Sequence, residues 1–347
     1  MKKYVKINSC KKSKTTDKYV YCIEVDNNHN FFVNNINIGN CRLQSNVKDL
    51  GYFNSIGGTS LEVGSVKVST INLAVIAYET KTPDEYIDLL KKRVLLDCQV
   101  LDIQRGIIKR NIEKSLLPNY THELVHLKSQ YSTIGIIGIY EVLDKFNMVT
   151  TDEFGNHSYT DEGLKFAKRI FKSIHKVKDN FSKNLDYHFN VEQIPGERAA
   201  AVLMEKDKIL YPEEKYELPL YGNQWIPLGV KCSINDKLKV SAALDKSANG
   251  GSIAHINLDS PIENFDTAWK LLNDVADSGV PYFSFCTKIS SCENNHGFYG
   301  DICPICGKKA VKYYTRIVGF LVPTTSFSSE RKDEFAKRLW FDFNETK

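Results

Sequence analysis

The residues best suited to metal chemistry crowd into a short window near the C-terminal end of this 347-residue chain. Cys303 and Cys306, in the sequence CPIC, are spaced so that two thiolates can share one metal ion. Tetrahedral zinc needs a second pair, and Cys292 with His296 is suitably placed to supply it. Cys286 competes with His296 for the fourth position. We therefore expect one structural Zn²⁺ per chain, and the alternative is a group of buried thiols.

A second reactive element is the peptide bond between Asn40 and Cys41. An asparagine side-chain amide can attack its own backbone carbonyl and release the following residue as a new N-terminus. Cys41 supplies a thiol, and a thiolate is a strong enough nucleophile to take over an upstream acyl group. The pair therefore indicates a self-splicing junction, and the alternative is a small β hairpin that ends in these two residues by chance.

The segment that ends at Asn40, VYCIEVDNNHNFFVNNINIGN, resembles the C-terminal splicing blocks of an intein in order and spacing. The resemblance covers residues 1–40 and implies that His29 assists cyclisation by proton transfer. Gly39 stands where inteins usually have His, and Cys22 stands where Asp is common. Because no N-terminal splicing blocks precede this segment, the resemblance implies a split intein whose other half lies on a second polypeptide.

From residue 41 to residue 347 the chain resembles the C-terminal part of the anaerobic (class III) ribonucleoside-triphosphate reductases, which are glycyl radical enzymes. The segments that carry the resemblance are CRLQSN, YFNSIGG, GSVKVSTINLAVIAYE, QYSTIGIIGIYE, QIPGERAAAVLMEKD, LYGNQWIPL and YYTRIVGFL. The resemblance implies part of a ten-stranded α/β barrel. A central loop of that barrel carries a thiyl-radical cysteine, and a C-terminal glycyl radical loop reaches in beside it. A structural zinc at the cysteine-rich window is also implied.

The resemblance assigns three catalytic residues. Cys41 matches the cysteine whose thiyl radical removes the 3′ hydrogen of the ribose, so splicing and catalysis both require it. Gly319 matches the radical glycine. A glycine has no side chain to twist the delocalised radical out of plane. The alternative is that this lone Gly in an apolar strand marks a bulge. Phe320 replaces the usual Tyr. Asn72 is expected to orient substrate, and the alternative is a buried strand-end amide satisfied by the backbone.

The function implied is anaerobic reduction of ribonucleoside triphosphates to deoxyribonucleoside triphosphates, after trans-splicing joins this chain to its N-terminal part. The expected partners are an N-terminal reductase part that carries the intein N-terminal half, an activating radical-SAM enzyme with an iron-sulfur cluster, ATP and dNTP effectors bound through the missing part, and a second copy in a homodimer. The alternatives are a glycyl radical enzyme for another substrate and a zinc-ribbon module that binds nucleic acid. The small net charge of +4 disfavours the last of these.

The elements that position these residues alternate between helices and short apolar strands, which favours an α/β architecture. We expect a Gly-rich loop and buried strand over 52–80, a turn and helix over 132–146, and a strand over 208–212. Further helices are expected over 82–117, 160–185, 264–279 and 328–341, and strands over 29–38, 187–195 and 252–258. No apolar run spans a membrane and no secretory signal is present, so we expect a cytosolic chain. The expected units are the intein fragment 1–40, the barrel part 41–285, the zinc knuckle 286–310, and the radical loop with the terminal helix 311–347.

Overall fold

The computed structural model describes residues 30–33, 36–39, 64–316 and 321–343. The helices are α1 (Leu73–Tyr78), α2 (Pro83–Glu113), α3 (Pro118–Thr121), α4 (Ile139–Lys145), α5 (Asp161–Ser182), α6 (Glu197–Leu210), α7 (Ile234–Leu244), α8 (Phe265–Asp277) and α9 (Ser329–Lys337), with short 3-10 turns η1 (Leu127–Ser129), η2 (Asp245–Ser247) and η3 (Thr324–Ser326). The strands are β1 (Asn30–Val33), β2 (Ile36–Gly39), β3 (Gly64–Asn72), β4 (Gln130–Ile137), β5 (Val149–Thr151), β6 (His157–Tyr159), β7 (Phe189–Gln193), β8 (Ala254–Asn257), β9 (Phe283–Cys286), β10 (Ile289–Cys292), β11 (Gly297–Phe298), β12 (Ala310–Arg316) and β13 (Leu321–Pro323).

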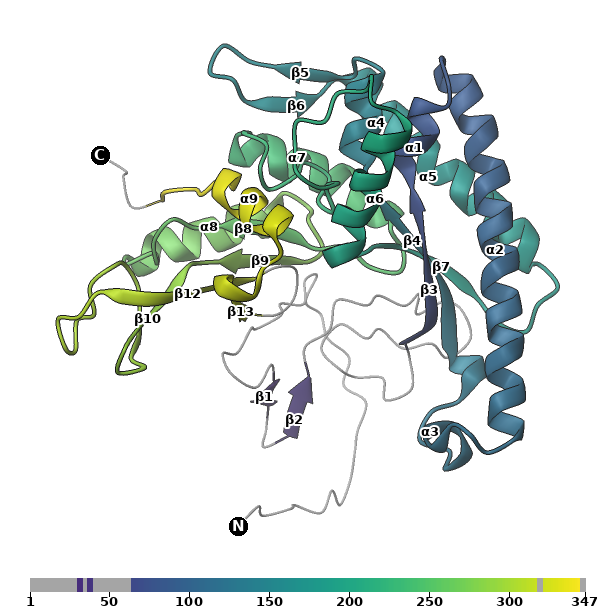
Figure 1. Ribbon diagram of the computed structural model, residues 1–347, viewed down its shortest axis with the longest axis horizontal. Coiled ribbons are helices and arrows are strands. Elements are labelled where there is room, and N and C mark those ends of the chain that lie inside the picture. Colours follow the sequence, from purple (N-terminus) through teal and green to yellow (C-terminus); the bar gives the residue numbers. More distant parts are fainter. Residues whose placement is uncertain (1–29, 34–35, 40–63, 317–320, 344–347) are drawn as a thin grey trace.

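The centre of the fold is a parallel sheet in the order β3-β4-β7, with α2 and α5 packed on one face (Figure 1). A second parallel pair, β8-β9, follows, and a parallel bridge joins Glu192 of β7 to Gly251, which precedes β8. Among the described strands, β3 pairs only with β4, so the described sheets do not close into a barrel. The expected α/β class is confirmed, and barrel closure stays a prediction.

Helix α2 shows how local sequence sets the scaffold. Thr82 caps it by accepting a hydrogen bond from the Glu85 amide at 3.3 Å, and Pro83 begins the helix, as the sequence predicts. Its buried face packs against the sheet and α5. The opposite face carries exposed apolar side chains one helical turn apart, which are Leu96, Val100, Ile103 and Ile107.

Two expected elements differ in the structure. Residues 132–137 belong to the buried strand β4, and the turn comes at Gly138, whose φ of +85° favours glycine and sets the start of α4. Residues 208–210 complete α6 instead of forming a strand, and the Tyr211 amide continues the helical pattern by donating to the Asp207 carbonyl at 2.7 Å. Isolated apolar runs do not distinguish a buried strand from a helix, so packing decided both.

The apolar run expected as a buried strand after the Gly-rich loop divides in two. Strand β3 ends at Asn72, and the segment LAVIAY that follows forms helix α1. The expected helices over 160–185, 264–279 and 328–341 appear as α5, α8 and α9, and the strands over 29–38, 187–195 and 252–258 appear as β1 with β2, β7 and β8.

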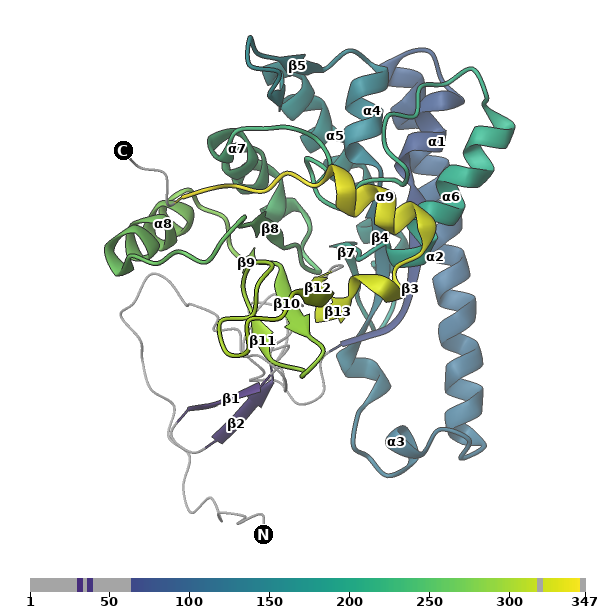
Figure 2. The same cartoon turned by 60° about the vertical axis from the view of Figure 1, so that its left-hand side comes forward.

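The C-terminal region forms an antiparallel sheet in the order β11-β10-β12-β13, which continues through η3 into α9 (Figure 2). The chain after α9 runs back along β8, where Phe341 bridges Leu258 and its amide donates to the Asn257 carbonyl at 2.8 Å. None of the helices in the described ranges is long and apolar enough to cross a membrane.

Candidate functional site

The four side chains expected to bind zinc come together in the structure. The ligand atoms of Cys292, His296, Cys303 and Cys306 all lie within 4.8 Å of one another. The sulfurs of Cys292 and Cys306 are 3.7 Å apart, and the Cys303 sulfur is 3.5 Å from His296 Nδ1. Cys292 and Cys303 are buried, so the group is closed to solvent on that side.

These distances fit a tetrahedral zinc ion. With Zn–S bonds of about 2.3 Å and Zn–N bonds of about 2.0–2.1 Å, a tetrahedron has S···S edges of about 3.8 Å and S···N edges of about 3.5 Å. Both distances within the group match these edges. All four positions are filled by protein atoms, which is the arrangement of a structural site with no open position for a substrate water.

Two tight turns bring the ligands together. Cys292 ends β10, and Asn295 adopts a φ of +59° that lets the chain reverse, so that the Cys292 amide donates to the His296 carbonyl at 3.3 Å. The second turn holds Cys303 and Cys306 and ends at Gly307, which has a φ of +71°. The Gly307 amide donates to the Cys303 carbonyl at 2.9 Å. Left-handed backbone at these positions favours Asn and Gly.

Cys286 is not part of this group. It ends β9, where its sulfur lies 3.3 Å from Nδ1 of His255 on β8. Its side chain is 3% exposed, and burial raises the pKa of its thiol to about 11. The geometry therefore favours His296 over Cys286 as the fourth ligand.

Asn72 lies buried at the junction of β3 and α1, where both ends of its amide have partners. The side-chain oxygen accepts from the Ala74 amide at 3.2 Å and so caps α1. The side-chain nitrogen donates to Asp207 Oδ2 at 2.6 Å. The same carboxylate oxygen accepts from the Tyr221 hydroxyl at 2.6 Å. A role of Asn72 in orienting substrate stays a prediction. In that role, the second hydrogen of the side-chain amide would donate to the substrate.

Sequence reasoning missed Asp207 and Tyr221 because they lie 135 and 149 positions from Asn72 along the chain. Asp207 lies in α6, whose sequence has the mixed polar and apolar composition of an ordinary helix. No pattern in a single sequence connects these three side chains.

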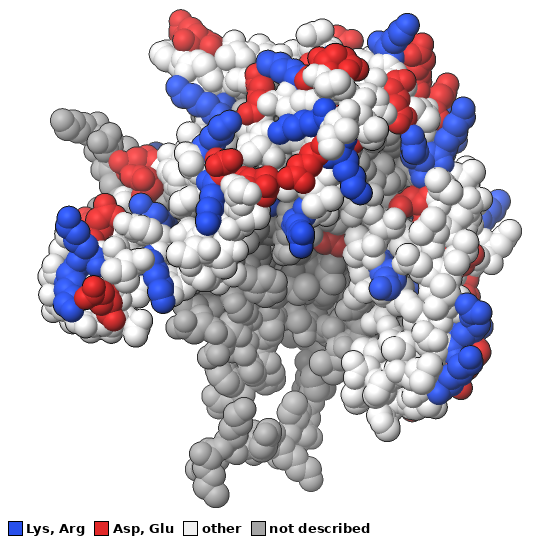
Figure 3. Space-filling view, viewed as in Figure 1, with Lys and Arg blue, Asp and Glu red and all other residues white. Residues whose placement is uncertain are grey.

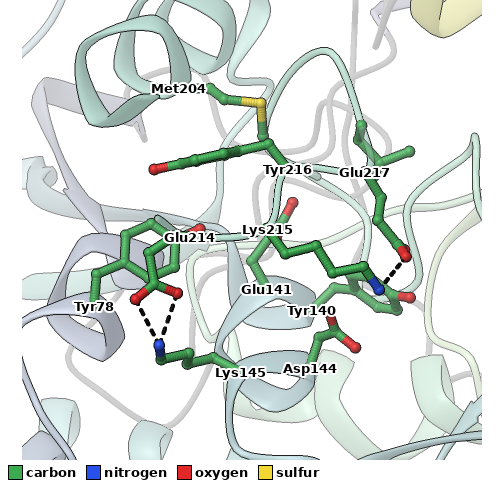
Figure 4. Close-up of a pocket in the computed structure, with 11 residues that line it drawn as sticks. Tyr78, Tyr140, Glu141, Asp144, Lys145, Met204, Glu214, Lys215, Tyr216 and Glu217 are labelled. Atoms are coloured by element: carbon green, nitrogen blue, oxygen red, sulfur yellow. Dashed lines mark hydrogen bonds and ion pairs between the residues drawn. The ribbon is translucent and has the colours of Figure 1, made fainter. Parts of the chain in front are cut away.

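A polar pocket lies between α4, α6 and the segment 214–218 (Figure 4). Glu141 points into it and accepts from the Gly222 amide at 2.9 Å, and burial raises the pKa of its carboxyl to about 7. Lys145 pairs with Glu214 across the pocket at 2.5 Å. None of the residues singled out in the sequence lines this pocket.

The remaining predicted residues lie outside the described ranges: His29, Asn40, Cys41 and Gly319, together with Cys22. Their flanks are described. The hairpin β1-β2 pairs Asn30 with Gly39, one residue before the predicted splice junction, and the pair β12-β13 joins Arg316 to Leu321 on either side of Gly319 in the sequence.

Comparison with known proteins gives consistent results. The family model described as "Anaerobic ribonucleoside-triphosphate reductase" matches residues 3–341. A solved structure of an "Anaerobic ribonucleotide reductase" is 39% identical, with a TM-score of 0.79, and the match covers 84% of this chain and 47% of that one. The Thermotoga maritima anaerobic ribonucleotide reductase with glycerol in the active site is 40% identical, with a TM-score of 0.76, over 82% of this chain and 47% of that one.

The same Thermotoga maritima enzyme in complex with dATP and CTP is 39% identical, with a TM-score of 0.74, over 80% of this chain and 46% of that one. This chain thus spans about half the length of the solved structures that it matches. No curated protein matches it significantly.

Proposed function

The chain belongs to the anaerobic ribonucleoside-triphosphate reductase family, and from this we propose that it supplies the C-terminal part of such an enzyme. The observation that carries the proposal is structural similarity at 39% identity over 84% of the chain. The chain spans 47% of that relative, and in this proposal an N-terminal reductase part joined to it completes the enzyme that reduces ribonucleoside triphosphates. The complete enzyme works in the cytosol in this proposal.

The chemistry proposed for the joined enzyme needs two residues of this chain. The radical on Gly319 takes the hydrogen atom of the Cys41 thiol, which leaves a thiyl radical and a closed-shell glycine. The thiyl radical then takes the 3′ hydrogen of the ribose, and the weakened 2′ C–O bond breaks as the hydroxyl leaves as water. An external reductant supplies two electrons together with two protons, one of which leaves in the water and one of which is added at C2′. The Cys41 thiol then returns its hydrogen atom to C3′, and the radical returns to Gly319. Asn72 would orient the substrate with its second amide hydrogen.

The zinc proposed for Cys292, His296, Cys303 and Cys306 has a structural role. A bound Zn²⁺ would cross-link the end of β10 to the two turns that follow it in the chain, and β10 pairs directly with β12. Strand β12 leads to Gly319 in the sequence. The metal would therefore hold the base of the radical loop without touching substrate.

The partners proposed are those of a complete reductase. One Thermotoga maritima structure has dATP bound in the specificity site, and another is a complex of the same enzyme with dATP and CTP. By analogy, a ribonucleoside triphosphate substrate and ATP or dNTP effectors would bind the joined protein, the effectors through the N-terminal part. A radical-SAM enzyme with an iron-sulfur cluster would generate the glycyl radical, and the joined protein would form a homodimer.

Joining is proposed to occur by protein trans-splicing at Asn40 and Cys41. The support is the order of splicing residues, together with a β hairpin whose last pair ends at Gly39, one residue before the junction. The family match begins at residue 3 as a single range, so it does not separate residues 1–40 from the reductase. The splicing proposal therefore depends on the chemistry of the junction and requires its own test.

The zinc-ribbon alternative has little support from surface charge. On the face seen in Figure 3, Lys and Arg side chains are mixed with Asp and Glu, and the net charge of the chain is only +4. A protein that binds nucleic acid through phosphates is expected to gather basic side chains on one face.

The test is activation of the joined protein without oxygen, followed by electron paramagnetic resonance. We expect a glycine-centred radical that Gly319→Ala abolishes. Cys41→Ser, made in a pre-joined protein so that splicing is not involved, should keep the radical and reduce no nucleotide. An activated wild type without a glycine-centred signal, or a Cys41→Ser protein that still forms deoxyribonucleotides, would overturn the assignment.

A further inference from the structure

Helix α9 and its C-cap residue Arg338 bury three charged side chains, although the sequence of this segment is that of a solvated charged helix. The side chains of Arg331, Glu334 and Arg338 are 8%, 6% and 1% exposed. Removing charges from water is costly unless they are paired with good geometry. A cluster of two cations and one anion at this depth therefore calls for a structural reason.

The geometry shows what the cluster holds. Arg338 binds both carboxylate oxygens of Glu334, with its Nε at 2.8 Å from one and a terminal nitrogen at 2.9 Å from the other. Arg331 donates to the same carboxylate at 3.2 Å. The other terminal nitrogen of Arg338 donates to the backbone carbonyl of Arg316 at 2.8 Å. The bidentate pair thus fixes the guanidinium plane and points its third donor at one peptide group.

That peptide group ends strand β12. Arg316 pairs with Leu321, the first residue of β13, and its own guanidinium donates to the Ser284 hydroxyl on β9 at 3.4 Å. Figure 2 shows α9 beside β12 and β13. The carbonyl held by Arg338 lies three positions before Gly319 in the sequence. The C-cap residue of α9 therefore holds the end of β12.

We propose that Arg338, oriented by Glu334, is a positioning residue that fixes the end of β12 and so sets the reach of the radical glycine. This inference rests on the proposed function. Hydrogen-atom transfer needs reacting atoms at about 3–3.5 Å, so a small displacement of the strand end reduces turnover. A lysine at position 338 would keep the charge, but it cannot hold a carboxylate with two nitrogens and a carbonyl with a third.

Hydrogen exchange on the chain as expressed tests the contact itself. Arg338→Lys and the double variant Arg338→Met with Glu334→Gln, which removes both charges together, should each speed amide exchange over the paired strands β12 and β13 about tenfold or more. That is the effect of losing a charge-assisted hydrogen bond worth about 1.4 kcal/mol. Lys332→Met, exposed on the same helix, is the matched control and should leave the rate unchanged. Wild-type exchange in both Arg338 variants would overturn the proposal.

Activated joined protein tests the consequence. Arg338→Lys should still form the glycyl radical, but nucleotide reduced per radical should fall about tenfold, while Lys332→Met should match the wild type. Rates per radical separate positioning from loss of folded protein. A wild type that forms no radical refutes the proposed function, and the positioning role with it. A wild type that forms the radical, with Arg338→Lys equal to it in turnover per radical, refutes the positioning role alone.

Discussion

Replacing His296 with alanine tests the metal centre most directly. A four-ligand structural zinc site is worth about 10–16 kcal/mol, so one ligand of four contributes about 2.5–4 kcal/mol. The distance of 3.5 Å between Cys303 Sγ and His296 Nδ1 matches a tetrahedral edge, so His296 should carry its full share. We expect zinc affinity to fall about 60- to 700-fold in the His296→Ala variant.

The assay is competition with a chromogenic chelator of known zinc affinity, together with metal analysis of the purified protein. Cys286→Ala is the matched control because this thiol lies beside His255 and outside the ligand group. It should retain one zinc per chain with unchanged affinity. Wild-type affinity in the His296→Ala variant, or loss of zinc in Cys286→Ala, would show that the ligand set is wrong.

Two further predictions concern the splice junction and the buried core. Co-expression with the proposed N-terminal partner should give one longer polypeptide that lacks residues 1–40. Asn40→Ala should block release of the intein segment, while a branched species remains visible on a gel. A wild type that stays at full length beside a verified partner argues against trans-splicing. Burial raises the pKa of Asp245 to about 7, while its carboxylate accepts from Trp225 Nε1 at 2.5 Å. Between its unfolded pKa of about 3.9 and about 7 the folded state keeps a proton that the unfolded state has released, so stability should fall as pH rises through this window. Asp245→Asn removes that cost. In denaturant unfolding, the free energy of unfolding of the variant minus that of the wild type should be greater at pH 8 than at pH 5. An equal difference at both pH values would contradict the burial argument.

Local signals in the sequence predicted much of the fold because the structures they specify are local. Helices α2 and α8 begin within one residue of the expected positions, and the spacing of the cysteine-rich window predicted a group that the structure assembles. The errors come from longer distances. The segment 208–210 has strand-like composition, but it continues α6 because the preceding turns of that helix already pack on the core.

Buried charge was also hidden from the sequence. A charged segment such as α9 normally indicates a solvated face, and only the tertiary contact with the Arg316 carbonyl, 22 positions away, shows why Arg338 is inside. The pairing of Asp207 with Asn72 is hidden in the same way. In both cases the partner that satisfies a polar group is set by chain topology, which single-residue patterns do not encode.

The single pairing of β3 has a consequence for how this protein is produced. Its other edge carries backbone N–H and C=O groups with no partner strand among the described residues, and Val68 within it is 45% exposed. Such an edge can recruit any extended chain, including an identical edge on another copy. Synthesis of this chain in excess of its proposed partner should therefore yield aggregates, whereas matched synthesis should yield soluble joined protein. The relative timing and dosage of the two polypeptides would then control yield.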